Sequence, residues 1–220
     1  MGLGRSRTWA VEGTKSSIKG EKMPVTRYPI AETFSSVQGE GAYTGTPTFF
    51  IRFAGCNVGR PLKEEERGNL PKYIERCRTW DERPFLCDTN FQLHRWYDLD
   101  ELIEIIPPEI RVCLTGGEPL IHDLGPLVKA LTGRGHTISL ETSGTITIPQ
   151  LVIDYCWVTI APKIKCLREN LQYADEIKFL VDEMFVESEV ERLLYGAAST
   201  IIIFLQPINR PRVVVEGFNQ

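Results

Sequence analysis

The sequence predicts an α/β fold built on a partial parallel barrel of about six strands. From residue 24 onward, apolar runs of four to seven residues alternate with segments of helical periodicity, which is the rhythm of βα units. At roughly 30 residues per βα unit, residues 24–220 are too few for an eight-stranded barrel. The motifs with chemical character follow predicted strand ends, so we expect them to converge on one rim of the sheet.

Six strands follow from short apolar runs rich in β-branched and aromatic residues. We expect them at residues 48–53, 111–114, 137–141, 157–160, 176–181 and 200–205. Three apolar stripes at helical spacing are expected to pack on this sheet. They consist of Leu99, Leu102, Ile103 and Ile106; of Leu124, Leu127, Val128 and Leu131; and of Phe185, Val186, Val190, Leu193 and Leu194.

The domain organisation is simple. Residues 1–23 mix Gly, Ser, Thr, Lys and Arg without periodicity, so we expect a flexible N-terminal tail. Residues 24–220 form the expected folded domain, which a polar insertion interrupts near residues 57–86. One domain of this size can bury a proper core.

Bulk composition favours a small-molecule function. The 220 residues carry a formal net charge of −4 and a pI near 5.5, which does not suit binding to nucleic acid through a basic surface. Six cysteines, no secretory signal and no apolar run near the ~20 residues that cross a bilayer favour a reducing, cytoplasmic setting. We therefore expect neither a nucleic-acid partner nor a membrane association.

The first predicted strand leads directly to a cysteine. Cys56 comes three residues after Phe53, and Cys77 and Cys87 follow within and just beyond the polar insertion. Thiolates bind iron–sulfur clusters and zinc strongly, so three thiols beside one strand end suit either kind of site. Free cysteines are also among the most buried side chains, which keeps plain packing as an alternative for the triplet. The other cysteines lack ligand spacing and are interpreted as packing residues: Cys113, Cys156 and Cys166.

Motifs around these cysteines resemble one enzyme family. In order, the chain carries Gln38-Gly39-Glu40-Gly41, Arg52-Phe53-Ala54-Gly55-Cys56, Cys87-Asp88-Thr89 and Gly116-Gly117-Glu118-Pro119. This ordered set, within residues 28–209, resembles the 7-carboxy-7-deazaguanine synthases, radical S-adenosylmethionine enzymes of the queuosine and 7-deazapurine pathway. The resemblance implies a partial barrel of the radical S-adenosylmethionine type.

The resemblance also implies a cofactor site. Cys56, Cys77 and Cys87 would hold three irons of a [4Fe-4S] cluster, and the fourth iron would bind S-adenosylmethionine. Ala161 departs from a family Ser-Pro-Lys segment and removes a hydroxyl group. The implied contacts to S-adenosylmethionine are Gly117, Glu141, Ser143, Ala161, Pro162, Lys163, Gln206, Pro207, Ile208 and Asn209.

Two of these motifs have a physical interpretation of their own. A Gly116-Gly117 pair lets backbone approach a ligand without a Cβ in the way, although a tight turn after a strand would use the same residues. Glu141 and Ser143 offer directed hydrogen bonds to a ribose or an amino acid. Helix capping by the hydroxyl is the alternative for Ser143.

The resemblance to the family also implies a substrate site. The residues that resemble contacts to 6-carboxytetrahydropterin are Val37, Gln38, Gly39, Arg52 and Thr115. The Arg52 guanidinium suits two-point capture of a carboxylate, with a surface ion pair as its alternative. Thr89 resembles a Mg²⁺ ligand, and a magnesium ion with few protein ligands is chemically ordinary. No side chain is expected to act as acid or base, because the cofactor carries the difficult chemistry.

The implied reaction converts 6-carboxy-5,6,7,8-tetrahydropterin to 7-carboxy-7-deazaguanine with loss of ammonia. It begins when a radical made from S-adenosylmethionine takes hydrogen from C6. The resemblance further implies a reducing partner such as flavodoxin or ferredoxin, and it is compatible with a homodimer.

Two alternative functions share part of this pattern. A radical enzyme acting on another substrate, such as a glycyl-radical activase, would keep the cluster but would not need Gln38, Arg52 and Thr89 together. A zinc-stabilised binding module would use the thiols but not the ordered cofactor loops.

The cysteine spacing departs from the common Cys-x3-Cys-x2-Cys pattern. The gaps are 20 and nine residues, and Arg60 stands where the short pattern places its second cysteine. Ligation requires convergence in space and not a fixed spacing, so Cys77 can serve if the insertion folds back. The Gln-Thr-His-Lys-like segment of many relatives is not found after Gln206-Pro207, so the resemblance does not extend to a substrate contact of that kind.

Overall fold

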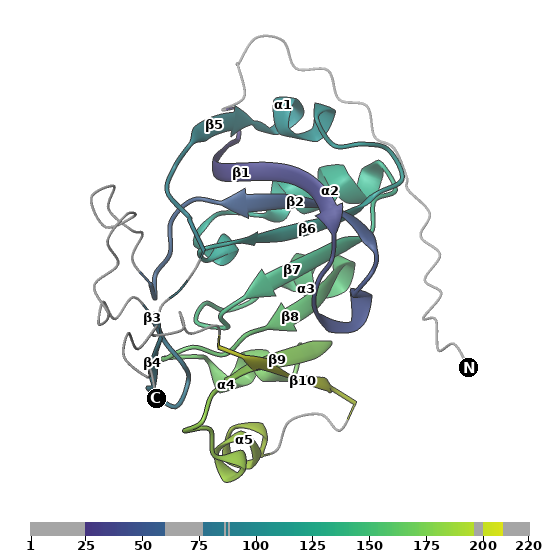
Figure 1. Cartoon of the computed structure of the whole chain (residues 1–220). Helices are drawn as coiled ribbons and strands as arrows, with labels where there is room; N and C mark the ends of the chain where they lie inside the picture. Colours follow the sequence, from purple (N-terminus) through teal and green to yellow (C-terminus); the bar gives the residue numbers. More distant parts are fainter. Residues whose placement is uncertain (1–24, 60–76, 86, 88, 196–199, 209–220) are drawn as a thin grey trace, which may run out of the picture.

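The computed structural model describes residues 25–59, 77–85, 87, 89–195 and 200–208. Within them, one sheet of eight strands has the order β10-β9-β8-β7-β6-β2-β1-β5 (Figure 1). Six neighbouring strands of this sheet run parallel, as predicted, and each overlaps one expected range. They are β2 (Pro47–Phe53), β6 (Arg111–Gly116), β7 (Ile138–Thr142), β8 (Cys156–Ile160), β9 (Glu176–Val181) and β10 (Ile202–Pro207).

Two further strands extend the sheet beyond β2 and were not predicted. β1 (Arg27–Val37) pairs antiparallel with β2, and β5 (Arg95–Asp98) pairs antiparallel with β1. Pro29 and the polar residues of β1 hide the strand pattern in the sequence. A proline is tolerated near the start of a strand, where its missing N–H matters least.

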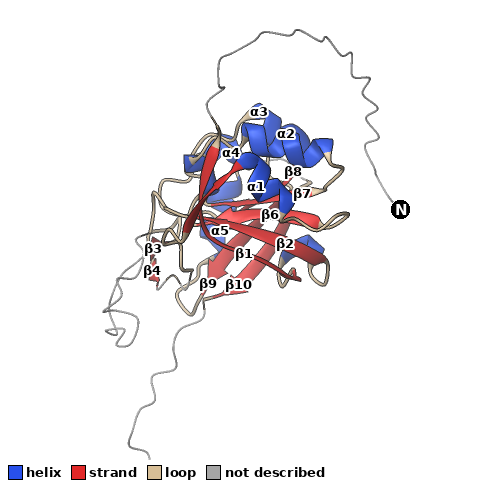
Figure 2. Cartoon of the chain, turned by 90° about the horizontal axis from the view of Figure 1, so that it is seen from above, coloured by secondary structure: helices blue, strands red, loops and turns tan. Residues whose placement is uncertain are grey.

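The helices pack on the sheet through the expected stripes. α1 (Leu99–Glu104), α2 (Gly125–Gly133) and α3 (Gln150–Tyr155) lie together on one face (Figure 2). Two more helices are α4 (Arg168–Leu171) and α5 (Glu187–Leu194). The stripes of α1 and α2 are confirmed, because Leu102, Leu127 and Leu131 are fully buried. The predicted packing of Val186 on the sheet is wrong: its side chain is 51% exposed, because α5 begins only at the next residue.

The core lies between the sheet and these helices. Its fully buried side chains include Phe53, Leu114, Leu140, Ile160 and Phe179, one from each of five neighbouring strands. Burial of such a side chain is worth about 1.5–3 kcal/mol relative to exposure. The parallel sheet is therefore the stable frame to which the loops are attached. None of the described helices is long and apolar enough to span a membrane.

The loop between β1 and β2 crosses to the far strands of the sheet. It contains a short 3-10 helix, Gly41–Tyr43, and the backbone N–H of Ala42 donates to Glu176 of β9 at 2.8 Å. Gly41 has φ +74°, and a Cβ there would meet the Glu176 carboxylate at 2.3 Å. The positive φ therefore favours glycine here, and the Glu176 carboxylate would have to shift to accept a larger residue.

Part of the polar insertion folds back against the sheet. β3 (Cys77–Arg78) and β4 (Pro84–Phe85) form a small antiparallel hairpin of their own. Figure 1 shows it on the side toward which the arrows of β2, β6, β7 and β8 point. The predicted tail at residues 1–23 and the middle of the insertion lie outside the described residues.

Candidate active site

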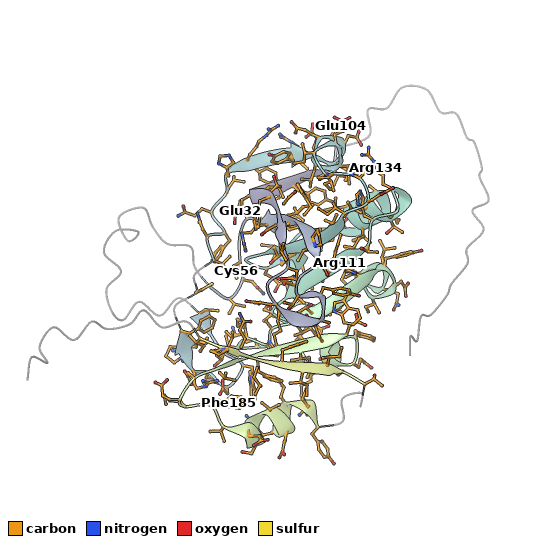
Figure 3. All side chains as sticks on the ribbon, turned by 45° about the vertical axis from the view of Figure 1, so that its right-hand side comes forward. Glu32, Cys56, Glu104, Arg111, Arg134 and Phe185 are labelled. Atoms are coloured by element: carbon orange, nitrogen blue, oxygen red, sulfur yellow. The ribbon has the colours of Figure 1, made fainter. Side chains whose placement is uncertain are left out.

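The carboxyl ends of the parallel strands surround a cavity of about 390 Å³. Cys56 marks this end of the sheet in Figure 3, on the same side as Glu32, whereas Arg111 marks the start of β6. Phe34, Phe50, Phe85 and Phe91 supply aromatic wall. The predicted site residues that line the cavity are Gln38, Gly39, Arg52, Cys56, Cys77, Cys87, Thr89, Thr115, Gly117, Glu141, Ser143, Ala161, Lys163 and Gln206.

The remaining predicted contacts are placed differently. Val37 is 56% exposed at the end of β1. Three further residues that the structure describes do not line the cavity: Pro162, Pro207 and Ile208. Pro162 and Pro207 are each next to a lining residue in the chain, and Ile208 follows Pro207. Asn209 lies outside the described part of the chain.

Cys56 is held by backbone from two loops. The N–H groups of Val58 and Gly59 donate to its sulfur at 3.4 and 3.3 Å, which are contacts that stabilise a thiolate. Gly55, just before it, has φ +87° and donates its N–H to the Phe91 carbonyl at 3.0 Å. Burial raises the pKa of the Cys56 thiol, and the two N–H groups oppose this rise.

The glycine pair after β6 packs directly against this loop. A Cβ on Gly117 would meet the Gly55 carbonyl oxygen at 2.1 Å and the Cys56 Cβ at 2.7 Å. Gly116 has φ +144°, and a Cβ there would meet the Phe53 backbone at 2.5 Å. The pair therefore combines a strand-end turn with close backbone packing beside the thiol.

Cys77 and Cys87 line the same cavity as Cys56. Burial raises the pKa of Cys77 to about 11, against the effect of the nearby Lys163 ammonium. Burial in turn lowers the pKa of Lys163, whose Nζ donates to the Ala161 carbonyl at 3.1 Å. Within the described residues, no three His, Cys, Asp or Glu side chains are gathered around one ion position.

These observations allow the implied cluster to be tested against the residues present. Three thiols line the cavity, two backbone N–H groups point at one of the sulfurs, and the Lys163 ammonium lies near the other two. Such donors and hydrogen bonds to sulfur are those that iron–sulfur clusters use. The residues fit a [4Fe-4S] cluster.

An ion network lies in the same cavity, and the buried Lys178 of β9 is its centre. Lys178 is 5% exposed, and its Nζ lies 3.2 Å from a carboxylate oxygen of Glu40 and 3.2 Å from one of Glu141. Burial lowers the pKa of Lys178, but the two carboxylates outweigh it and the pKa is raised. A charged residue within the apolar run of β9 was the signal that sequence reasoning missed.

The Glu141 carboxylate accepts hydrogen bonds from three side chains. Thr115 donates its hydroxyl at 2.9 Å and Gln38 its amide at 3.3 Å, besides the Lys178 ammonium. Burial raises the pKa of Glu141, but the ammonium and these hydrogen bonds lower it overall. Gln206 donates to Glu40 at 2.5 Å. Four motifs that are distant in the sequence therefore meet in one network.

Glu118 is a second residue whose role sequence reasoning missed. It is fully buried and accepts the Thr142 hydroxyl at 2.7 Å and the Ser143 N–H at 2.8 Å. The Ser143 hydroxyl also donates to it. Glu118 thus fixes the loop after β7 to the loop after β6, and it engages the hydroxyl predicted to face the cofactor.

Arg52 lies on β2 at the cavity wall. Its Nε pairs with Glu32 of β1 at 2.6 Å, with the side chains 20% and 52% exposed. The guanidinium carbon is 5.9 Å from the centre of the Phe34 ring. The ion pair predicted as the alternative is present, and the same side chain lines the cavity.

A partial parallel barrel with three thiols and glycine-lined loops at its carboxyl-end rim defines a radical S-adenosylmethionine enzyme. No family model matches the sequence. The chain is 37% identical over 170 residues to the 7-carboxy-7-deazaguanine synthase of Synechocystis sp.. This match covers 74% of this chain and 71% of that protein. The chain is 31% identical over 206 residues to the synthase of Escherichia coli K12, covering 84% and 86%.

The fold agrees with these relatives. The crystal structure of QueE from Escherichia coli matches with a TM-score of 0.64 and 31% identity, over 84% of this chain and 85% of that one. The chain belongs to the 7-carboxy-7-deazaguanine synthase family.

Proposed function

We infer that this chain is a radical S-adenosylmethionine lyase that forms 7-carboxy-7-deazaguanine in queuosine biosynthesis. Family membership over most of the chain supports this function. The observation that carries it is the convergence of three thiols and four of the five predicted pterin contacts on one cavity. The substrate is a 6-carboxytetrahydropterin, which loses one ammonia without net oxidation or reduction.

We propose Cys56, Cys77 and Cys87 as the cluster ligands. A [4Fe-4S] cluster bound there would supply the one-electron reduction that opens S-adenosylmethionine. The protein's part is to position the reactants and to keep water away, and four phenylalanines in the cavity wall suit that task.

The contacts to S-adenosylmethionine are proposed along the loops that follow β6, β7, β8 and β10. Gly117 permits close backbone approach, and Lys163 and Gln206 reach the cavity wall. Ser143 is proposed to act by holding its loop, because its hydroxyl already donates to Glu118. Ala161 would contribute only backbone, since its side chain has no hydroxyl.

The pterin contacts are proposed at Gln38, Gly39, Arg52 and Thr115. Arg52 carries a planar fork that can hold a carboxylate at two points. The aromatic wall suits a flat ring system, because aromatic faces pack well on one another. For Arg52 to bind substrate, its pair with the exposed Glu32 would be exchanged for the substrate carboxylate. Glu32 is 52% exposed, and solvent screening weakens such a pair, which favours the exchange.

Thr89 is proposed as a ligand of Mg²⁺ shared with the substrate, since it lines the cavity close to Cys87 in the chain. Thr89→Ala should weaken the magnesium dependence of turnover and leave the cluster spectrum unchanged. An equal magnesium response in the variant and the parent would remove Thr89 from the site. We also propose a flavodoxin or ferredoxin as electron donor, a homodimer as the assembly and a cytoplasmic location.

Anaerobic reconstitution tests the function. We expect about four irons and four sulfides per chain, as in a [4Fe-4S] centre, and formation of 7-carboxy-7-deazaguanine. Cys56→Ala and Cys87→Ala should abolish both. A protein that binds zinc and takes up no iron would contradict the proposal, and a cluster that cleaves S-adenosylmethionine without forming this product would assign another substrate.

A further inference from the structure

We propose that Arg83 is a positioning residue for Cys77: it clamps the β3–β4 hairpin to the end of β9 and so holds this thiol at the cavity. The inference rests on the proposed function in one respect, which is that Cys77 binds the cluster. It addresses the 20-residue gap that separates Cys77 from Cys56. A loop of that length does not by itself place a ligand.

The hairpin cannot hold its own shape. Each strand has two residues, Cys77–Arg78 and Pro84–Phe85, and even longer isolated hairpins are marginal in water. Hydrogen bonds between Thr79 and Arg83 close its turn: Thr79 N–H donates to the Arg83 carbonyl at 3.0 Å, and Arg83 N–H donates to the Thr79 hydroxyl oxygen at 3.0 Å. Fixing Cys77 therefore requires contacts to the main sheet.

Arg83 supplies the most extensive of these contacts. One terminal nitrogen pairs with Asp182 and the other donates to the Leu180 carbonyl at 3.1 Å, both at the end of β9, while Nε pairs with Asp81 within the hairpin at 2.6 Å. The side chains of Arg83, Asp81 and Asp182 are 10%, 10% and 3% exposed. A guanidinium can satisfy three acceptors in one plane, whereas an ammonium cannot.

Further contacts attach the hairpin to the same side of the sheet. Thr79 forms a β-bridge with Lys163 after β8, and Ile164 N–H donates to the Arg78 carbonyl at 3.3 Å. The Trp80 ring lies 6.0 Å from that of Phe179 in β9. Cys77 is two residues from the bridge and is 7% exposed, so its position follows from that of the hairpin.

Removal of the clamp should release Cys77 selectively. In the iron-free full chain, Arg83→Gln removes the Arg83 guanidinium from its pairs with Asp182 and Asp81, and breaking a buried pair in this way is strongly unfavourable. We expect alkylation of Cys77, read by peptide mass spectrometry, to become about tenfold faster or more through local opening of the hairpin. Cys113 and Cys156 are buried in the main sheet and should keep their parent rates.

Companion variants make the test specific. Asp182→Asn attacks the other half of the clamp and should act in the same direction. Arg83→Lys keeps the charge but loses the fork, so its rate should fall between parent and Arg83→Gln. Arg27→Gln is the matched control, because Arg27 pairs with Asp98 in an exposed position, with side chains 57% and 48% exposed.

The second readout is the cluster. Reconstituted Arg83→Gln and Asp182→Asn should lose iron to a chelator faster than the parent, and Arg27→Gln should not. Unchanged alkylation of Cys77, equal acceleration at Cys113, or selective release of Cys77 without faster iron loss would each overturn the proposal.

Failure of the proposed function would be recognised separately. A parent that holds a stable cluster yet forms no product contradicts the function while the labelling result on the clamp stands. A parent that binds no cluster overturns both.

Discussion

Two regions of the molecule bring thiols to the same cavity by different physical means. Cys56 follows β2, a strand paired on both sides, and its strand buries Ile51 and Phe53 completely. Cys77 lies on a two-residue strand outside the main sheet, and buried ions attach it. Apolar packing thus fixes one thiol, and a charge clamp fixes the other.

The difference matters because the two kinds of support respond to different changes. Burial of apolar surface is non-directional and tolerates changes of charge nearby. A buried ion pair depends on geometry, because its attraction must offset the cost of removing two charges from water. The Cys56 side should therefore be sensitive to changes in shape, and the Cys77 side to changes in charge.

The largest effect is expected from a change of shape alone, next to Cys56. In Gly117→Ala the new methyl group would meet the Gly55 carbonyl oxygen at 2.1 Å, and backbone cannot yield as a side chain can. We expect the free energy of unfolding, measured by urea unfolding, to fall by about 1–3 kcal/mol or more. We also expect the variant to fail to hold the cluster, measured by iron content.

Gly133→Ala is the control for this change. A methyl group at Gly133, at the end of α2, meets nothing within 4 Å. Its stability should stay equal to the parent's or rise slightly. A Gly117→Ala protein with parent stability and a normal cluster would show that the loops do not depend on close backbone packing.

A second substitution sharpens the comparison by removing charge from the main sheet. Lys178→Met leaves the carboxylate of Glu141, whose side chain is 26% exposed, without the Lys178 ammonium, and we expect the free energy of unfolding to fall. Because Lys178 lies on β9 and not on the hairpin, alkylation of Cys77 should change far less than in Arg83→Gln. Urea unfolding gives the stability, and equal release of Cys77 in both variants would refute the division into two regions.

The third prediction concerns the substrate end of β2. Arg52→Lys keeps the charge and loses the two-point fork. Charge-assisted hydrogen bonds are worth about 1.5–3 kcal/mol, so we expect turnover of the carboxylated pterin to fall by roughly tenfold to a hundredfold. Uncoupled cleavage of S-adenosylmethionine should change much less. A variant that loses the cluster, or one with parent turnover, would make Arg52 a structural residue only.

The smallest effect is the pH dependence of the ion network. The folded state lowers the pKa of Glu141, so its contribution is present above the unfolded value of about 4.3 and is lost as pH falls through the folded pKa. The folded state raises the pKa of Lys178, so that contribution is present below about 10.4 and is lost as pH rises through the folded value.

Glu141→Gln tests the acid side of this dependence. The variant should be less stable than the parent at neutral pH, and the difference should shrink as the pH falls below about 4. Unfolding free energies at several pH values measure this change. A difference that is constant with pH would show that Glu141 acts only as a packing group.

Much of the frame could be predicted from local patterns. Apolar runs gave the six parallel strands, and helical stripes gave the faces of α1 and α2. Motif order placed most of the cavity residues because strand ends in a parallel sheet share one edge. β1 was not predicted as a strand, because Pro29 and the polar residues of β1 resemble a loop.

The contacts that hold Cys77 could not be predicted. A two-residue strand has no period to detect, and Arg83 and Asp182 are 99 residues apart in the chain. Lys178 was visible as a charge in an apolar run, but its partners, Glu40 and Glu141, come from distant loops. Such pairings exist only after the sheet has brought its strand ends together.

The most direct test of the account is product formation by the parent chain. The 220-residue chain, reconstituted under anaerobic conditions, should be incubated with S-adenosylmethionine, a low-potential reductant and 6-carboxy-5,6,7,8-tetrahydropterin. Mass spectrometry and an ammonia assay should show one 7-carboxy-7-deazaguanine and one ammonia for each pterin consumed. A protein with a complete cluster that leaves the pterin unchanged would contradict the central claim.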